Sequence, residues 1–369
     1  MTFYLFFITI FILSQAGFMV GWIFLGHMKL KRNNSVQGPI ISLSQLTVVI
    51  PFRNEIKRIL PLLQSIENSN LQPVKYIFVN DHSTDNTEKR IAEKLQTEYY
   101  EIFHLDDSKQ GKKEAVSRGV QHAKTEFVLT LDADVWFDSV YFDHISKLQQ
   151  VDLQILPVRI KTRNFISEFF HQDVELANSV NQSTAGWIRP VLCSGANLLF
   201  RRDSFLEETK NSNYFEKSSG DDIYLLQLFQ LAGKSIQIQL DQHAAVQTLG
   251  TQSIQEFVSQ RARWIGKSRH VADALTNRLV ILQFLLSIGF YIALILVIQR
   301  FSLLELMVFL IGKLTIDSLC LWPYYSTYKR YKMWFIVPVY IFILPFINIF
   351  LLIYSLTKTP RWKDRLVVQ

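Results

Sequence analysis

Three long stretches of this chain contain no Asp, Glu, Lys or Arg, and they limit its fold more than any other feature. They cover residues 3–26, 279–298 and 333–356. Each is long enough to cross a hydrocarbon core of about 30 Å as a helix. We therefore predict one membrane span before and two spans after a long segment of mixed polarity.

A fourth apolar stretch, residues 302–322, also carries Glu305, Lys313 and Asp317. Charged side chains are costly in lipid unless they face other helices or a polar cavity. We predict a further span here as well. The carboxyl-terminal membrane domain, 279–357, would then hold two to three spans.

The charges that flank the first stretch predict its orientation. It is followed, and not preceded, by a basic cluster of Lys29, Lys31 and Arg32, which fits an uncleaved anchor over 1–27 better than a signal peptide. Because Lys and Arg collect on the cytoplasmic side, residues 27–278 should lie inside the cell. We expect an integral protein of the bacterial inner membrane with a cytosolic central domain.

The basic tail, 358–369, does not fit this orientation. Four full crossings would place it outside the cell, against the positive-inside rule. Either one apolar stretch is re-entrant, with Pro338 and Pro345 as candidate break points, or the rule fails here.

The net charge of +7 at pH 7 raises the question of nucleic acid. Much of the excess charge lies beside the apolar stretches, where it can meet anionic lipid. A clustered basic face with interleaved aromatic residues is missing, so we expect membrane lipids and no nucleic acid as partners. Cys193 and Cys320 fall in different predicted regions, which argues against a disulfide framework.

The central segment alternates short apolar runs with helical patterns. The runs cover 46–50, 76–79, 101–105 and 127–131. Strand and helix alternation at this spacing predicts an α/β domain with a mixed, mostly parallel sheet covered by helices on both faces. Polar residues that follow the strands should then lie at one edge of the sheet, where such folds place their sites.

Three polar clusters follow the predicted strands. VVIPFRNE ends in Asn54 and Glu55, and taken alone it is more often a helix cap than a site. In VNDHSTDNT, Asp81 could accept hydrogen bonds from a base or ribose, although an Asx turn through Ser83 or Asp85 explains the pattern equally well.

The third cluster, LDADV, brings two hard oxygen ligands together. Asp132 and Asp134 stand one residue apart in an extended segment just after a strand. Two such carboxylates suit Mg²⁺ or Mn²⁺ bridging a diphosphate. Acidic pairs are common in loops, so the position after the strand is what favours a metal site.

Two later motifs have simple structural explanations too. The GDD motif with Asp222 precedes an apolar helix and could act only as a cap. In QRARW, helical spacing puts Gln260 beside Arg263 and Trp264, a face that could bind phosphate or could anchor the chain at a membrane surface.

The order of these motifs is more specific than any one of them. VVIPFRNE, VNDHSTDNT, GKKEAVSRG, LDADV, CSGANLLFRR, GDD and QRARW succeed one another between an anchor and further apolar stretches. The chain resembles glycosyltransferase family 2 over residues 44–270. The flanking stretches and WKDR are similar to its membrane-bound members, such as cellulose, hyaluronan and poly-N-acetylglucosamine synthases and ceramide glucosyltransferases.

The resemblance implies a GT-A fold and a role for each matching residue. It implies a catalytic base at Asp222, metal and diphosphate ligands at Asp132 and Asp134, and an acceptor border at Gly195 and Asn197. The implied nucleotide-sugar pocket is Pro51, Glu55, Asp81, Lys112 and Asp132, and the implied contacts to diphosphate and acceptor are Gln260, Arg263 and Trp264.

The chain departs from the family pattern at three positions. Asn80 replaces the first acid of an acidic pair, and Asp221 stands where glutamate is more common. Ser117 replaces the asparagine usual after the glycine-lysine motif, which leaves the donor nucleotide open.

These features together predict an inverting, Mg²⁺- or Mn²⁺-dependent hexosyltransferase. It would move a sugar from a nucleotide-sugar, a UDP-sugar by preference, to a hydroxyl on a lipid or growing glycan at the membrane. One alternative is transfer to polyprenyl phosphate, although enzymes of that kind usually lack QRARW. Another is a catalytically silent subunit of a polysaccharide-synthesis complex, which the intact acidic motifs argue against; other partner subunits are not indicated by the sequence.

Overall fold

The chain divides into two compact units. The computed structural model describes residues 2–34, 38–95, 98, 100–162, 165–210, 212, 214–215, 221–269, 273–300, 302–357, 361–362 and 365–366. The helical unit comprises Met1–Ser35, Glu168–Val191 and Ala272–Lys358, and the sheet unit comprises Val36–Ser167, Leu192–Val271 and Thr359–Gln369. Residues 168–191 thus belong to the helical unit, although they lie inside the range 44–270 expected for the central domain.

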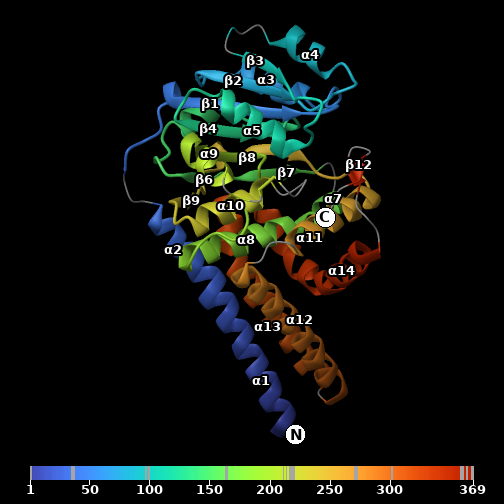
Figure 1. Ribbon diagram of the computed structural model, residues 1–369. Helices are drawn as coiled ribbons and strands as arrows, with labels where there is room; N and C mark the ends of the chain where they lie inside the picture. The colour runs from blue at the N-terminus through green and yellow to red at the C-terminus, as the bar shows by residue number, and fades with distance from the viewer. Residues whose placement is uncertain are drawn as a thin grey trace. The chain divides into compact units, whose positions relative to one another are not determined.

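The sheet unit is built on a seven-stranded mixed sheet in the order β3-β2-β1-β4-β8-β6-β9 (Figure 1). Its strands are β1 Leu46–Phe52, β2 Lys75–Asn80, β3 Tyr100–His104, β4 Phe127–Leu131, β6 Leu153–Ile155, β8 Asn197–Arg201 and β9 Ile236–Ile238. The first four strands are parallel, and β8 is antiparallel to both β4 and β6. The predicted α/β fold with a mixed, mostly parallel sheet is confirmed.

Helices and a smaller sheet complete this unit. The small sheet has the order β5-β10-β7, and β11 pairs with β12. These strands are β5 Val135–Trp136, β7 Val158–Lys161, β10 Val246–Leu249, β11 Arg361–Trp362 and β12 Arg365–Leu366. The helices are α3 Leu60–Glu67, α4 Thr87–Lys94, α5 Lys112–His122, α6 Tyr141–Ile145, α9 Arg202–Lys210, α10 Asp221–Leu231 and α11 Ile254–Arg269, with 3-10 turns η2 Leu43–Gln45 and η3 Gln242–Ala244.

Strand β1 lies inside the sheet between β2 and β4, and six of its seven residues are apolar. All seven residues are buried, as expected for a parallel strand covered on both faces. Gly119 allows α5 to approach closely, since a Cβ there would meet Val49 Cγ1 at 2.4 Å. The carboxyl end of β1 is therefore held between two layers of packing.

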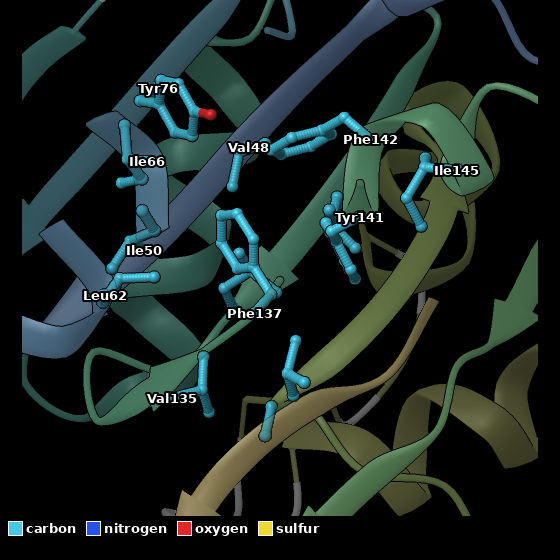
Figure 2. Close-up of a cluster of buried hydrophobic side chains, with 14 of the residues drawn as sticks. Val48, Ile50, Leu62, Ile66, Tyr76, Val135, Phe137, Tyr141, Phe142 and Ile145 are labelled. Atoms are coloured by element: carbon cyan, nitrogen blue, oxygen red, sulfur yellow. The ribbon is translucent and has the colours of Figure 1, made fainter. Parts of the chain in front are cut away.

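On one face of the sheet, an aromatic and aliphatic core joins β1 to α3 and β5 (Figure 2). Ile50 and Leu62 lie close to Val135 and Phe137 in this cluster. The backbone N–H of Phe137 also donates to Ser65 Oγ, at 3.0 Å, which fixes β5 against α3. This packing sets the position of the residues just before β5, where the LDADV motif lies.

The helical unit contains the long apolar helices. Its elements are α1 Thr2–Ala16, the π-helix η1 Gly17–Phe24, α2 Leu25–Asn33, α7 Phe165–Phe170, α8 Gln172–Trp187, α12 Ala274–Arg300, α13 Leu303–Thr327, η4 Tyr331–Phe335 and α14 Val337–Thr357. Helices α1 and α12 pack through Phe11 and Phe290, whose ring centroids are 6.3 Å apart. Helix α7 crosses the boundary between the units.

Two helical stretches, Phe6–Asn33 and Ala274–Gln299, are long and apolar enough to cross a membrane. A signal sequence or a core helix of a soluble protein can meet the same test of length and composition, so these two spans stay predictions. The other two predicted spans form α13 and α14, which contain Pro323 and Pro345. Their passage through a membrane also stays a prediction.

Helix α8 is polar along its length and buried within the helical unit. It meets α2 at two glycines, where a Cβ on Gly186 would lie 1.9 Å from the Gly26 carbonyl oxygen. Its polar side chains bond to other helices: the Tyr325 hydroxyl donates to Gln172 at 2.9 Å, and Gln182 donates to the Tyr328 hydroxyl at 2.8 Å. Small residues and interhelical hydrogen bonds are the means by which helices pack without a hydrophobic driving force.

Candidate active site

The carboxyl ends of β1, β2 and β4 meet at one edge of the sheet. Phe52 pairs with Asn80, and the next residue, Asp81, donates its backbone N–H to the Phe52 carbonyl at 2.9 Å. Strand β4 pairs with β1 on the side opposite β2, and Asp132 directly follows β4. The three predicted polar clusters therefore lie at a common edge, and Pro51 is a buried residue of β1 next to them.

The loops after β1 and β2 are tied together by side-chain hydrogen bonds to backbone groups. Asn54 Oδ1 accepts from the Thr84 N–H at 2.8 Å, and the Asn54 N–H donates to Ser83 Oγ at 3.1 Å. Asp85 accepts from the Thr87 N–H at 3.0 Å, so the Asx turn expected here is present. Both loops contain a residue with positive φ, Asn54 at 51° and His82 at 56°.

Asp81 is held at the base of these loops. Its side chain is only 3% exposed. Arg53 Nη1 donates to the Asp81 carbonyl at 3.0 Å and lies 3.9 Å from the carboxylate Oδ1. His82 Nδ1 lies 3.3 Å from the same Oδ1. These contacts hold the Asp81 side chain in place.

The two carboxylates of LDADV each pair with a cation of the chain. Lys112 Nζ lies 2.6 Å from Asp132 Oδ1, and Arg58 Nη1 donates to Asp134 Oδ2 at 2.8 Å. The side chains of Asp132 and Asp134 are 32% and 28% exposed. Lys112 opens α5 directly after Gly111, whose φ of 99° allows the chain to turn into the helix.

These residues fit a divalent metal that is completed by its substrate. Within the part of the chain that the structure describes, no group of three or more His, Cys, Asp or Glu side chains could hold a metal alone. Mg²⁺ is commonly held by one or two carboxylates together with substrate phosphates. Asp132 and Asp134 supply two accessible carboxylates, and a diphosphate would supply the remaining oxygens.

The GDD and CSGAN motifs come together as well. The Gly195 N–H donates to Asp222 Oδ2 at 3.3 Å, and the Ile223 N–H donates to Asp222 Oδ1 at 2.8 Å. Asp222 lies in the first turn of α10, where the helix dipole favours a carboxylate. Asp222 thus accepts a backbone N–H of this first turn through Oδ1, while its Oδ2 lies beside the loop implied to border the acceptor.

Asn197, implied to border the acceptor, has a side chain inside the sheet unit. Its side chain is fully buried, and its Nδ2 donates to the carbonyls of Pro157 at 2.8 Å and Ala244 at 3.0 Å. The Tyr141 hydroxyl donates to its Oδ1 at 2.6 Å. Burial raises the pKa of Tyr141 well above its usual range, with this hydrogen bond opposing part of the shift, so Tyr141 stays protonated as the donor. Asn197 therefore braces the sheet.

The QRARW motif lies on α11, with Gln260 and Arg263 half-buried and Trp264 exposed. Arg261 of the same motif contacts Trp264: its guanidinium lies 4.4 Å from the indole centroid and 4.7 Å from the Phe257 ring centroid. Arg261 also donates to Gln260 Oε1. Sequence spacing singled out Arg263 and Trp264 on this helix, and the structure adds Arg261, three residues before Trp264.

Sequence reasoning missed two further basic residues, Arg58 and Lys113. Lys113 is buried, donates to the Tyr214 carbonyl at 2.8 Å, and lies 4.4 Å from the ring centroid of Tyr224 in α10. Consecutive lysines at the start of α5 thus contact Asp132 and the helix that carries Asp222. The doubled lysine in GKKEAVSRG was the signal available in the sequence.

Known proteins are similar to parts of this chain. Residues 47–207 match the family described as Glycosyl transferase family 2. A 4,4'-diaponeurosporenoate glycosyltransferase of Staphylococcus aureus (strain USA300) is 43% identical over 93 residues, which cover 25% of this chain and 24% of that protein. The match thus spans about a quarter of the curated relative.

Solved structures also resemble this chain. The mannosyltransferase PcManGT from Pyrobaculum calidifontis, in complex with GDP-Man and Mn²⁺, superposes with a TM-score of 0.57 and 17% identity, over 95% of this chain and 99% of that chain. TarS 1-349 of S. aureus, in complex with UDP-GlcNAc, gives a TM-score of 0.40 and 13% identity over 79% and 90% of the two chains. The chain has the GT-A fold, and its residues 47–207 are similar to glycosyl transferase family 2.

Proposed function

We propose that this chain is an inverting, metal-dependent glycosyltransferase that uses a nucleotide-sugar and acts at a membrane. The observation that carries the proposal is the common edge of the sheet, where Asp81, Asp132 and Asp134 gather within the segment matched to the family. The site residues implied by the resemblance, and the integral inner-membrane location with a cytosolic sheet unit, belong to the same proposal.

In the proposed donor site, different side chains bind the base or ribose, the metal and the diphosphate. Asp81 would recognise the base or ribose, with Glu55 and Pro51 bordering the pocket. Asp132 and Asp134 would hold the Mg²⁺ or Mn²⁺, which when bound neutralises charge on the leaving diphosphate. Lys112, already 2.6 Å from Asp132, adds a second cation near that charge. Gln260, Arg263 and Trp264 would contact the diphosphate and the acceptor.

In the proposed reaction an acceptor oxygen attacks the anomeric carbon as the bond to the diphosphate breaks. The electron pair of that bond leaves with the nucleoside diphosphate, and configuration inverts. When the acceptor is a hydroxyl, Asp222 takes its proton. The Gly195 N–H, 3.3 Å from Asp222, would hold the carboxylate toward the acceptor.

The acceptor in this proposal is a lipid or short glycan with a hydroxyl group. A second candidate is a lipid carboxylate, because the curated relative is named for glycosylating a carotenoid acid. A carboxylate is already ionised at neutral pH and needs no base. Transfer to polyprenyl phosphate would require a phosphate oxygen as the nucleophile, and it would likewise leave Asp222 without a proton to remove.

The first test is a panel of UDP-, GDP- and dTDP-sugars offered to the purified full-length protein with Mn²⁺ and membrane lipid extract. We expect one donor to release its nucleoside diphosphate, with release lost when EDTA removes the metal. If no donor turns over and UDP or GDP also fails to bind with Mn²⁺, a catalytically silent subunit becomes the better description of this chain.

The Asp222→Asn variant then separates the acceptor classes. For a hydroxyl acceptor we expect kcat to fall by about 10²- to 10⁴-fold, the usual contribution of general base catalysis. For a carboxylate acceptor the fall should be much smaller, because no proton is removed. Analysis of the product supplies the control, since a glycosyl ester is cleaved by mild alkali and a glycoside is not.

A further inference from the structure

Arg58 connects the two sides of the candidate donor site. Its Nη1 donates to Asp134 Oδ2 at 2.8 Å, and its Nη2 lies 2.8 Å from Glu55 Oε2. The Glu55 side chain is only 7% exposed, whereas that of Arg58 is 48% exposed. One planar guanidinium thus bridges a buried carboxylate implied in nucleotide binding and an accessible one implied in metal binding.

The backbone around Arg58 keeps this bridge in place from the Glu55 side. The N–H groups of Arg58 and Ile59 both donate to the Glu55 carbonyl, at 2.8 and 2.9 Å, in the turn that leads into α3. The Glu55 N–H donates to Thr87 Oγ1 at 2.8 Å. Arg58 therefore starts from a rigid turn, and only its exposed end has freedom to move.

Asp134 is also held by the fold. It immediately precedes Val135, whose side chain belongs to the core shown in Figure 2. Its carbonyl accepts from Thr248 Oγ1 at 3.5 Å across the small sheet. The backbone of Asp134 is thus held at the sheet edge. A cation that binds the Asp134 carboxylate must compete with Arg58, which already contacts it.

We propose that Arg58 competes with the metal for the Asp134 carboxylate. When the metal binds, the Arg58 guanidinium moves from Asp134 to the anionic donor. This inference rests on the proposed metal site. The guanidinium neutralises Asp134 in the metal-free protein and releases it to the divalent cation. It stays tied to Glu55, and its freed N–H groups face the diphosphate that arrives with the metal.

The energetics of the two ion pairs support this exchange. A pair between partly exposed side chains contributes little, so a divalent cation can displace it at small cost. The contact to Glu55 is more buried and is reinforced by the turn, so it is the one that persists. A guanidinium also matches the geometry of phosphate oxygens, which it can bind through two parallel hydrogen bonds.

The exchange predicts a coupling that can be measured without any acceptor. In the Arg58→Gln variant of the full-length protein, Mn²⁺ should bind Asp134 without competition, about two- to fivefold more tightly than in the wild type, the range expected for loss of an exposed pair. The gain in UDP affinity that Mn²⁺ causes should become smaller, since the freed arginine is missing. Mn²⁺ binding is followed by electron paramagnetic resonance of the free ion, and UDP binding by calorimetry.

Two further variants separate direct competition from a general effect of charge. Lys57→Gln removes the same charge one residue away, and it should change Mn²⁺ affinity by less than the Arg58→Gln variant. Arg58→Lys keeps the charge but offers one nitrogen in place of the two that contact Asp134 and Glu55. Its Mn²⁺ affinity should lie between those of the wild type and Arg58→Gln.

The inference is overturned if Arg58→Gln leaves Mn²⁺ affinity unchanged or weaker, if Lys57→Gln shifts it equally, or if none of the proteins binds Mn²⁺. Sugar transfer by the wild type distinguishes this failure from failure of the proposed function. If the wild type transfers sugar and the Mn²⁺ affinities of the wild type and Arg58→Gln are equal, the proposed function stands and only the role of Arg58 is refuted.

Discussion

Asn197 holds three parts of the sheet unit together through one side-chain amide. Its hydrogen bonds reach the hydroxyl of Tyr141 and the carbonyls of Pro157 and Ala244. The hydrogen bonds to Tyr141 and Ala244 are fully buried. Loss of either partner therefore costs the desolvation of the remaining group as well as the bond. A residue of the CSGAN motif thus has a structural reason to be asparagine.

We expect Asn197→Ala to lower the stability of the sheet unit by about 2–4 kcal/mol, because it leaves several buried polar groups without partners. Thermal unfolding followed by circular dichroism would show this as a lower midpoint. Tyr141→Phe, which removes one of the three hydrogen bonds, should lower the midpoint by a smaller amount. An unchanged midpoint combined with lost sugar transfer would instead favour the role at the acceptor border.

The residues that sequence analysis missed have a common physical reason. Arg58 stands in the turn before α3 and Lys113 in the first turn of α5. Their partners lie far along the chain: Arg58 pairs with Asp134, and Lys113 contacts Tyr214 and Tyr224. A single sequence shows which side chains follow a strand, since that depends on local order. It does not show which cation reaches across a sheet edge.

At the scale of the elements, helices α2 and α8 approach each other closely at Gly26 and Gly186, which have no side chains. A Cβ at Gly186 would lie 1.9 Å from the Gly26 carbonyl oxygen, a distance that no side-chain movement can relieve because the obstacle is backbone. Trp22 and Trp187 stack beside this crossing, with centroids 6.3 Å apart. The crossing is therefore built for backbone contact and cannot widen without losing the stacked rings.

Gly186→Ala should force these helices apart and destabilise the helical unit by about 1–3 kcal/mol, the usual cost of overpacking. Gly21→Ala is the matched control, since a Cβ at Gly21 meets no atom within 4 Å. Thermal stability in detergent, measured by the temperature at which half of the protein aggregates, should fall for the first variant and not for the second. Equal stability of both variants would contradict the close crossing.

Strands β1, β2, β3 and β4 were predictable because each contains a short, largely apolar run followed by polar residues. The predicted run 127–131 coincides with β4, and 46–50 falls short of β1 by two residues. The antiparallel strand β8 was seen only as part of a motif, and β6 and β9 are three residues long, too short for any periodicity to appear. Their places depend on pairings across long sequence separations.

For the whole molecule, the predicted orientation places the sheet unit on the cytoplasmic side of the membrane. The two helical stretches that can cross a membrane, Phe6–Asn33 and Ala274–Gln299, enclose most of the sheet unit in the sequence. A segment between two consecutive crossings stays on one side. The link between α12 and α13 should then emerge on the opposite side.

Cysteine labelling tests this orientation. In a background with Cys193 and Cys320 replaced by serine, Lys124→Cys should react with a membrane-impermeant maleimide only after the cells are permeabilised. Leu303→Cys, at a position 72% exposed at the start of α13, should react in intact cells. Labelling of both positions in intact cells, or of neither, would refute the proposed topology.

The interleaving of the two units in the sequence affects how the chain can be made and cut. Strands β8 and β9 leave the ribosome after α8, so the sheet is completed only once a helix of the other unit has been synthesised. A fragment expressed from 44 to 270 would include α8 but lack the Gly26 backbone and the tyrosines of α13 against which its polar face packs. Replacing 168–191 in such a fragment with a short flexible linker would remove that orphaned helix and retain all seven strands of the main sheet.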